Sequence, residues 1–239
     1  MTRIRADLLL VARGLAESRA KARAAIEARG VLADGAVVAK PSDLIAEDAV
    51  LEVTPAHPWV SRGGVKLAAA LDAFGVDPSG RVCLDVGAST GGFTHVLLAR
   101  GAARVYAVDV GHGQLHASLR GDPRVVNLER TDARSLTREL IAEAPTLIVC
   151  DASFIGAAKV LATPLALAAE RADLVVLIKP QFEAGPGKGG VLGEEDARAA
   201  AALAIDALDG LEDFAHSASM HSPIRGGDGN LEILAHFRR

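Results

Sequence analysis

The sequence predicts an α/β protein in which a small α+β domain precedes a doubly wound sheet. Beyond about residue 60, apolar runs typical of strands alternate with segments of helical periodicity. Several of these strands end on a charged residue, and a glycine-rich turn follows the first of them. The opening residues differ, because they are rich in arginine and hold only short apolar runs.

The small domain begins with two predicted helices. The first runs from about Ala6 to Arg13 and stops at Gly14. Ser18 is a favourable N-cap for a second helix that reaches about Arg29, with Gly30 as its C-cap.

Short strands follow these helices. Val31-Leu32 and residues 36–38 flank Asp34-Gly35, a dipeptide that favours a two-residue hairpin turn. Residues 50–53 supply another strand. Two prolines then mark residues 55–60 as an extended connector, which divides the chain into domains at 1–54 and 61–239. Trp59 in this connector either packs the two domains together or relays RNA contact to the second domain, and the sequence does not choose between these roles.

The second domain reads as a Rossmann-like sheet with helices between its strands. Ligands of such sheets bind at the carboxyl ends of the strands, so residues that directly follow a strand are the candidates for chemistry. Strands are expected near Val82, Val105, Val125, Leu147, Leu174, Phe214 and Ile233, and helices near Leu67, Phe93, Gln114, Val160 and Ala199.

A glycine-rich turn after the first of these strands predicts a small-molecule site. Glycines allow the backbone to approach a ligand closely, and the helix expected from Phe93 to Arg100 points its amides at that ligand. The spacing is not G-x-G-x-x-G, which disfavours a nicotinamide cofactor and hence an oxidoreductase. A strand-ending acid suits a cationic ligand such as S-adenosylmethionine. The predicted cofactor-binding residues here are Asp85, Gly87, Ala88, Ser89, Thr90, Gly91, Gly92 and Phe93.

Four further charged residues complete the expected crevice. Asp109 ends the second strand at the distance from the glycine turn where a carboxylate accepts from ribose hydroxyls. Asp132, after the third strand, is the expected acceptor for an adenine amine. Asp151 and Lys179 end the fourth and fifth strands, and a lysine behind a buried strand is costly unless it is paired.

Composition limits the other classes of function. The 239 residues lack a signal peptide and an apolar span of about 18 residues, so we expect a cytoplasmic protein with no membrane contact. The two cysteines offer no metal spacing, and only His112 and His116 share a helical spacing, so no metal is expected. Net charge is −4, yet seven basic residues face three acidic ones between Arg3 and Arg29, which favours a polyanionic partner.

The arginine-rich segment resembles the alpha-L RNA-binding motif first seen in ribosomal small-subunit protein four. The resemblance lies in Arg13-Gly14-Leu15, Ser18-Arg19, Gly30-Val31, Asp34-Gly35 and Pro41-Ser42. It implies that the second helix and the hairpin bind structured RNA. The matching positions are Arg5, Arg13, Ser18, Arg19, Lys21 and Arg23.

The second domain resembles the FtsJ-type 2′-O-ribose methyltransferases. Lys66 and Glu232 join Asp151 and Lys179 in the order Lys, Asp, Lys, Glu, beside the segments 151–155 and 179–183. With the RNA-binding module in front, nearly the whole chain resembles the hemolysin A (TlyA) family of rRNA methyltransferases. That resemblance implies S-adenosylmethionine-dependent methylation of a cytidine 2′-hydroxyl in ribosomal RNA, with these four residues catalytic.

Two departures and two alternatives remain. Where the family pattern has a proline-containing loop, residues 226–232 read Gly-Gly-Asp-Gly-Asn-Leu-Glu, a more flexible and more acidic passage. The chain stops at Arg239, without the C-terminal tail of family members that modify both ribosomal subunits, so we expect it to act on the large subunit and little on the small one. We also expect a monomer. The alternatives are a non-catalytic RNA-binding ribosome factor and a haemolytic, membrane-active protein.

Overall fold

The computed structural model describes residues 2–153, 155–183 and 191–239, so Phe154 of the 151–155 motif lies outside the described residues. The chain divides into two compact units, Met1–Pro58 and Trp59–Arg239. Each unit has its own hydrophobic core.

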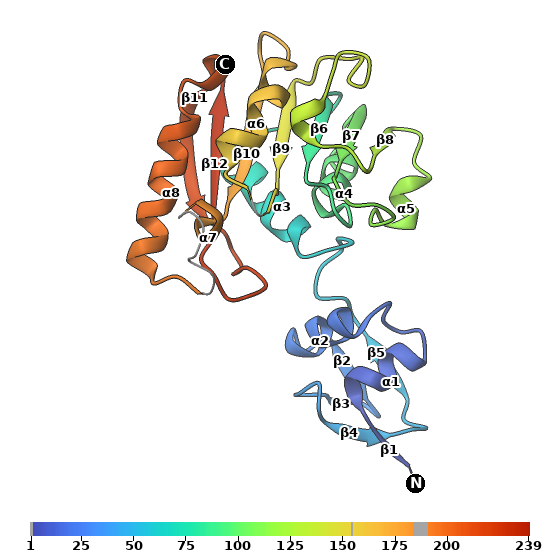
Figure 1. Ribbon diagram of the computed structural model, residues 1–239. Coiled ribbons are helices and arrows are strands. Elements are labelled where there is room, and N and C mark those ends of the chain that lie inside the picture. Colours follow the sequence, from blue (N-terminus) through green and yellow to red (C-terminus); the bar gives the residue numbers. More distant parts are fainter. Residues whose placement is uncertain (1, 154, 184–190) are drawn as a thin grey trace. The chain divides into compact units, whose positions relative to one another are not determined.

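The first unit is a small α+β domain (Figure 1). Its core includes Ala6 and Leu10 from the first helix and Ala22 and Ile26 from the second, one helical turn apart in each case. Strand β2 lies between β3 and β5 in an antiparallel sheet, and β1 pairs with β4. The elements are β1 (Arg3–Arg5), α1 (Ala6–Ala12), α2 (Arg19–Glu27), β2 (Val31–Ala33), β3 (Ala36–Val37), β4 (Leu44–Ala46) and β5 (Leu51–Val53).

The predicted hairpin turn is confirmed, and one predicted cap is wrong. Asp34 and Gly35 both have positive φ, at 50° and 78°, as a turn between β2 and β3 requires. The C-cap of α2 is Ala28, and the left-handed residue after it is Arg29 rather than Gly30. Gly30 is needed for a different reason, because a Cβ there would lie 2.3 Å from the carbonyl oxygen of Thr54.

The second unit is the predicted doubly wound sheet, with seven strands in the order β11-β12-β10-β9-β6-β7-β8. Strands β6 to β10 are parallel, and β12 runs antiparallel to both β10 and β11. The elements are α3 (Gly63–Phe74), β6 (Val82–Val86), α4 (Gly92–Ala99), β7 (Arg104–Val108), α5 (Ala117–Arg120), β8 (Val125–Leu128), η1 (Ala133–Ser135), β9 (Leu147–Cys150), α6 (Ala157–Ala166), β10 (Asp173–Ile178), α7 (Pro180–Glu183), α8 (Glu194–Leu208), η2 (Leu211–Asp213), β11 (Ala215–His221) and β12 (Ile233–Arg238).

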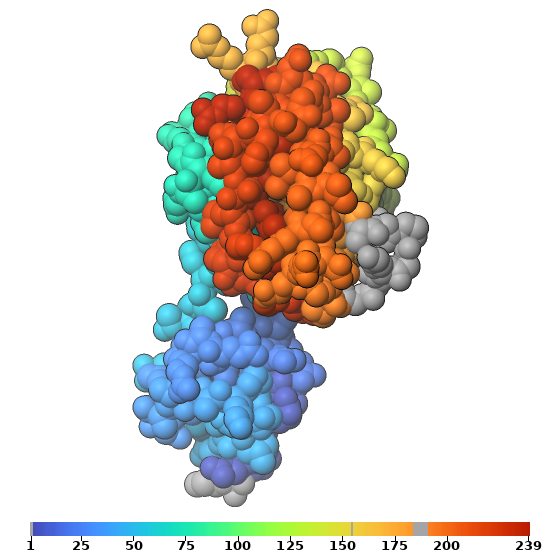
Figure 2. Space-filling view, turned by 90° about the vertical axis from the view of Figure 1, so that its left-hand side faces the viewer, coloured from blue at the N-terminus to red at the C-terminus, as the bar shows by residue number. Residues whose placement is uncertain are grey.

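Helices cover both faces of this sheet. Along β6, Cys83 belongs to the core under α3 and α4, whereas Leu84 belongs to the core under α6 and α8. Because successive side chains point to opposite faces, a strand buried on both sides reads as a continuous apolar run. Helix α8 and strand β11, in orange and red, form one outer side of the unit in Figure 2.

Trp59 packs within the second unit. Its ring meets the ring of His95 edge-on at 5.4 Å between centroids, and a Cβ on Gly64 would lie 2.4 Å from its Cγ. The backbone amide of Val60 also donates to Nδ1 of His95. The indole therefore holds the start of α3 against α4.

The predicted helix at Gln114 is wrong, since the helix in this region covers only Ala117–Arg120. The carboxylate of Glu129 explains the difference. It accepts hydrogen bonds from the backbone amides of Gly113, Gln114 and Leu115, which therefore wrap around an anion and do not open a helix. These bonds hold the pKa of Glu129 down at about 2.

The chain reverses direction across the sheet at β6. From β6 it proceeds outward through β7 and β8, and it then returns to the other side of β6 as β9 and β10. The carboxyl ends of β6, β7 and β9 therefore border the crevice in which doubly wound folds bind their ligands.

Candidate active site

A pocket of about 580 Å³ opens at this crevice. That volume is in the usual range for a cofactor-sized ligand. Its walls come from the turns that follow β6, β7, β8 and β9. The residues whose roles are argued below and which line it are Gly87, Ser89, Asp109, Asp132, Asp151 and Ser153.

The glycine turn after β6 brings the backbone of Gly87 close to the backbone of Ala152. Gly87 has a φ of 82°, and a Cβ there would lie 3.1 Å from the backbone of Ala152. Ser89 adopts a φ of 47° beside it, and Gly91 caps α4 with a φ of 92°. A Cβ on Gly92 would lie 2.1 Å from Oγ of Ser61. The glycines of this turn are therefore required by close packing against neighbouring residues as well as by the need to leave the pocket open.

Asp109 fastens the two turns that face the pocket. Its Oδ2 accepts from the amide of Ser89 at 2.8 Å, and its Oδ1 accepts from the amide of Gly111 at 2.7 Å. Each carboxylate oxygen has a second lone pair, so Asp109 can also accept from a ligand hydroxyl. The ribose contact of Asp109 stays a prediction.

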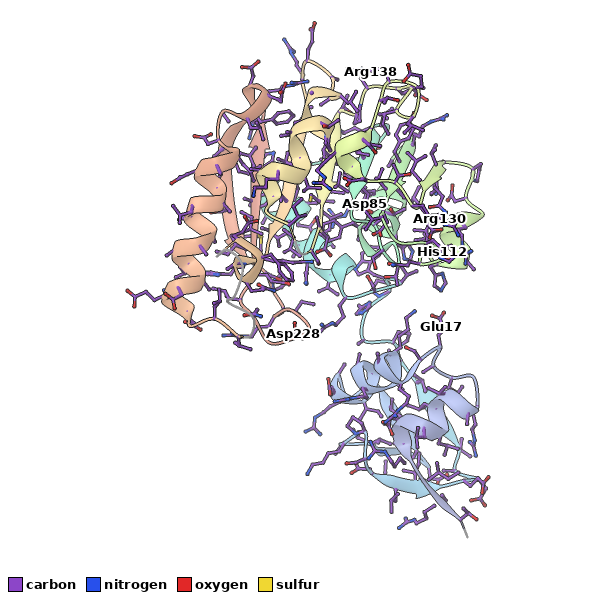
Figure 3. The ribbon with its side chains drawn as sticks, in the orientation of Figure 1. Glu17, Asp85, His112, Arg130, Arg138 and Asp228 are labelled. Carbon is purple, nitrogen blue, oxygen red and sulfur yellow. The ribbon has the colours of Figure 1, made fainter. Side chains whose placement is uncertain are left out.

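Asp85 lies among the elements of the second unit (Figure 3). It is fully buried and does not line the pocket. Its Oδ2 accepts from the hydroxyl of Thr94 at 2.6 Å, while Oδ1 has no hydrogen-bond partner among the described residues. Burial, assisted by repulsion from Asp151 and Asp109, raises the pKa of this carboxyl to about 7. A buried acceptor without a donor suits a cationic group supplied by a ligand.

Asp132 lines the pocket and also caps η1. It accepts from the backbone amide of Arg134 and forms an ion pair with the guanidinium of the same residue at 2.6 Å. These bonds hold the pKa of Asp132 at about 2, so it is a carboxylate near neutral pH. The other predicted cofactor residues, Ala88, Thr90, Gly91, Gly92 and Phe93, do not line the pocket.

Lys179 forms an ion pair with Asp151, which lines the pocket. The Nζ of Lys179 lies 2.6 Å from Oδ1 of Asp151 and also donates to Oγ of Ser153 at 2.7 Å. Lys179 directly follows β10 and Asp151 directly follows β9, so the parallel register of these neighbouring strands brings them together.

Lys66 and Glu232 form a second pair, which is almost completely buried. Their Nζ and Oε2 atoms are 2.5 Å apart, and the side chains are 8% and 3% exposed. Gly226 gives room for this pair, because a Cβ there would lie 2.8 Å from Oε1 of Glu232. The start of α3 connects the two pairs, since a Cβ on Gly63 would lie 3.5 Å from Oδ2 of Asp151.

Three residues of this region were not predicted. Thr94 supports Asp85, Glu129 shapes the loop after β7, and Ser153 contacts Lys179. Thr94 lies in the first turn of a helix that follows a strand-ending acid, which is a signal that the sequence does carry. The other two contacts depend on loop conformations that no periodicity reports.

Most of the predicted RNA-binding residues also make contacts inside the first unit. Arg5 and Arg19 both bind the buried carboxylate of Asp7, whose pKa they lower to about 2. Their side chains are still 42% and 58% exposed, so part of each guanidinium faces solvent. Arg23 on α2 is exposed.

Arg13, Ser18 and Lys21 also have structural roles within the first unit. Arg13 donates to the carbonyl oxygens of Ala49 and Glu47, which fastens the end of α1 to the segment before β5. Ser18 is the N-cap of α2, as predicted, and accepts from the amide of Lys21. Lys21 also forms an ion pair with Glu17.

Comparison with known proteins agrees with both units. The FtsJ-like methyltransferase family matches residues 59–239, and the S4 domain matches residues 4–51. A 16S/23S rRNA (cytidine-2′-O)-methyltransferase TlyA from Mycobacterium tuberculosis is 48% identical over 99% of this chain and 90% of its own length. The chain belongs to the TlyA family.

Two further proteins extend the comparison. A 23S rRNA (cytidine-2′-O)-methyltransferase TlyA from Campylobacter jejuni is 33% identical over 82% of this chain and 78% of its own length. A solved structure from Streptococcus thermophilus, described as a candidate hemolysin, is 36% identical with a TM-score of 0.72 and covers 100% of this chain and 89% of its own. The family resemblance and the fold class predicted from the sequence are thus confirmed.

No group of three or more His, Cys, Asp or Glu in the described parts of the chain could hold a metal ion. Among the same residues, no helix is long and apolar enough to cross a membrane.

Proposed function

We propose that this TlyA-family protein transfers a methyl group from S-adenosylmethionine to the 2′-hydroxyl of a cytidine in ribosomal RNA. The observation that carries the proposal is the Lys179–Asp151 pair at the wall of a cofactor-sized pocket. The names of two relatives support the substrate, since both act on cytidine 2′-hydroxyls of rRNA.

Residues in and next to the pocket fit S-adenosylmethionine by chemistry, although Asp85 itself does not line it. Asp85 offers a buried carboxylate oxygen without a donor, which suits the ammonium group. Asp109 suits the ribose hydroxyls and Asp132 the adenine amine, both from positions on the pocket wall. The positive φ of Gly87 and the close approach of Ala152 both disfavour a side chain at position 87.

The two lysine pairs suit the activation of a hydroxyl. Bound S-adenosylmethionine supplies a methyl group that is already electrophilic, so the protein has to orient the alcohol and remove its proton. Asp151 fixes the Nζ of Lys179, which in its neutral form accepts the hydroxyl proton. Glu232 neutralises Lys66, so the second pair adds no net charge to the buried side of the site.

The first unit supplies the RNA contact in this proposal. The exposed parts of Arg5, Arg19 and Arg23 offer cationic donors for phosphates. We assign the substrate to the large ribosomal subunit, because 23S rRNA is common to the names of both relatives. We also propose that the protein acts as a monomer in the cytoplasm, where ribosomal subunits are found.

Two single substitutions test the proposal by separating binding from chemistry. Lys179→Ala should lower methyl transfer to rRNA by roughly 10²–10⁴-fold and leave the calorimetric Kd for S-adenosylmethionine nearly unchanged. Asp109→Ala should raise that Kd by roughly 10–100-fold, because it removes a charge-assisted hydrogen bond. Wild-type turnover in the Lys179 variant, or unchanged cofactor affinity in the Asp109 variant, would contradict the corresponding role.

A further inference from the structure

The Nζ of Lys179 has three hydrogen-bond acceptors around it. Oδ1 of Asp151 lies at 2.6 Å, Oγ of Ser153 at 2.7 Å and the carbonyl oxygen of Asp151 at 3.3 Å. These three oxygens equal in number the N–H donors of a lysine ammonium. Ser153 supplies one of the two short contacts.

A lysine needs more than one contact to be held in place. Its side chain has four rotatable bonds, and a single ion pair leaves the amine free to turn about the carboxylate. Only two side chains fix Nζ among the described residues, and they are Asp151 and Ser153. Both come from the segment after β9 and both line the pocket.

We propose that Ser153 is a positioning residue for Lys179 and so for the methyl-transfer step. The Ser153 hydroxyl orients the Nζ of Lys179 toward the substrate hydroxyl. The inference rests on the proposed role of Lys179. It does not require Ser153 to contact the cofactor or the RNA.

Geometry of this kind affects the rate constant of the chemical step. Misplacement of a catalytic group by a fraction of an ångström lowers turnover without changing how substrate binds. Loss of one hydrogen bond to a charged group should therefore lower kcat by roughly tenfold, with KM for rRNA and the cofactor Kd unchanged.

The test measures kcat, KM for rRNA and cofactor Kd in Ser153→Ala, Ser153→Thr and Lys179→Ala. Ser153→Ala should lose about tenfold in kcat alone, and Ser153→Thr should recover most of the loss because it keeps the hydroxyl. Ser217→Ala is the matched control, since the Ser217 hydroxyl accepts from the guanidinium of Arg238 on β12, outside the pocket lining. That control should have wild-type kinetics.

Three results would overturn the inference. Wild-type kcat in Ser153→Ala, with Lys179→Ala inactive, would remove Ser153 and leave the role of Lys179 intact. A loss in Ser153→Ala that falls on KM or on the cofactor Kd would make Ser153 a binding group. An active Lys179→Ala variant would contradict the proposed role of Lys179 and the inference with it.

Discussion

Asp85 makes the stability of this protein depend on pH in an unusual direction. The pKa of its carboxyl is raised from 3.8 to about 7 in the folded state by burial. Stability from this group is fully present below its unfolded pKa and is lost as pH rises through the folded one. Asp85→Asn removes the titration while keeping the size of the side chain.

The size of the effect follows from the shift. One pKa unit corresponds to about 1.36 kcal/mol, so a rise of about 3 units amounts to about 4 kcal/mol across the whole range. Between pH 5 and 7 the wild type should lose about 2–3 kcal/mol relative to Asp85→Asn. For a chain of this size that equals a relative change in Tm of roughly 4–12 °C.

Thermal unfolding of both proteins at half-unit intervals from pH 5 to 8 measures this difference. Other groups that titrate equally in the wild type and in Asp85→Asn do not contribute to the difference in Tm between them. Asp206→Asn, an exposed carboxylate on α8, is the control and should run parallel to the wild type. Parallel curves for wild type and Asp85→Asn would refute the reasoning. A weaker affinity of Asp85→Asn for S-adenosylmethionine, by roughly 10–100-fold, would separately support an ammonium contact.

Three other contacts give predictions of their own. Asp7→Asn should destabilise the first unit by about 1 kcal/mol at pH 6, and by less as the pH falls toward 2. The pKa of Asp7 is lowered in the folded state, so its contribution to stability is present above the ordinary pKa of 3.8 and is lost below it. Hydrogen exchange of the amides in α1 and α2 measures this change in stability. Lys66→Met and Glu232→Gln should each lower the free energy of unfolding by about 3–5 kcal/mol, and the double variant should lose less than the sum of the two. Urea unfolding of the wild type, both single variants and the double variant measures these losses. Additive losses would contradict the pairing. Gly92→Ala should lower Tm by overpacking against the Ser61 hydroxyl, and adding Ser61→Ala should restore part of the loss; no restoration would place the clash elsewhere.

The sheet of the second unit was predictable because its strands are buried on both faces. Runs such as Leu147–Cys150 and Asp173–Ile178 are nearly continuous in apolar residues, and the parallel order places Asp151 beside Lys179. The antiparallel pairing of the three-residue strands β1 and β4 was not predictable, since so short a segment has no periodicity of its own.

Loop conformation limited the prediction of the site. The sequence indicates Asp85 and Asp109 as strand-ending acids, but it does not show that the first is fully buried outside the pocket lining and the second lies on the pocket wall. Gly113 and Gln114 fold around the carboxylate of Glu129, a residue 15 positions from Gln114, so no local signal distinguishes their turn from a helix.

The arginine content of the first unit predicted a basic surface, but it did not predict the ion pairs that these arginines make within the unit. A count of charges between Arg3 and Arg29 cannot reveal that Arg5 and Arg19 share the buried Asp7. The burial of that carboxylate depends on how α1, α2 and the preceding strand pack, which is a tertiary property. RNA contact by these arginines therefore stays a prediction of charge and resemblance.

The central claim is methylation of a cytidine 2′-hydroxyl in ribosomal RNA. In the most direct measurement, the protein and S-adenosylmethionine are incubated with purified small subunits in one reaction and with purified large subunits in another. The rRNA from each reaction is then digested with nuclease, and the fragments are analysed by mass spectrometry. One 2′-O-methylcytidine in 23S rRNA, absent when Lys179→Ala replaces the wild type, is the predicted result. Methyl groups on bases, on other nucleosides or on neither subunit would contradict the claim.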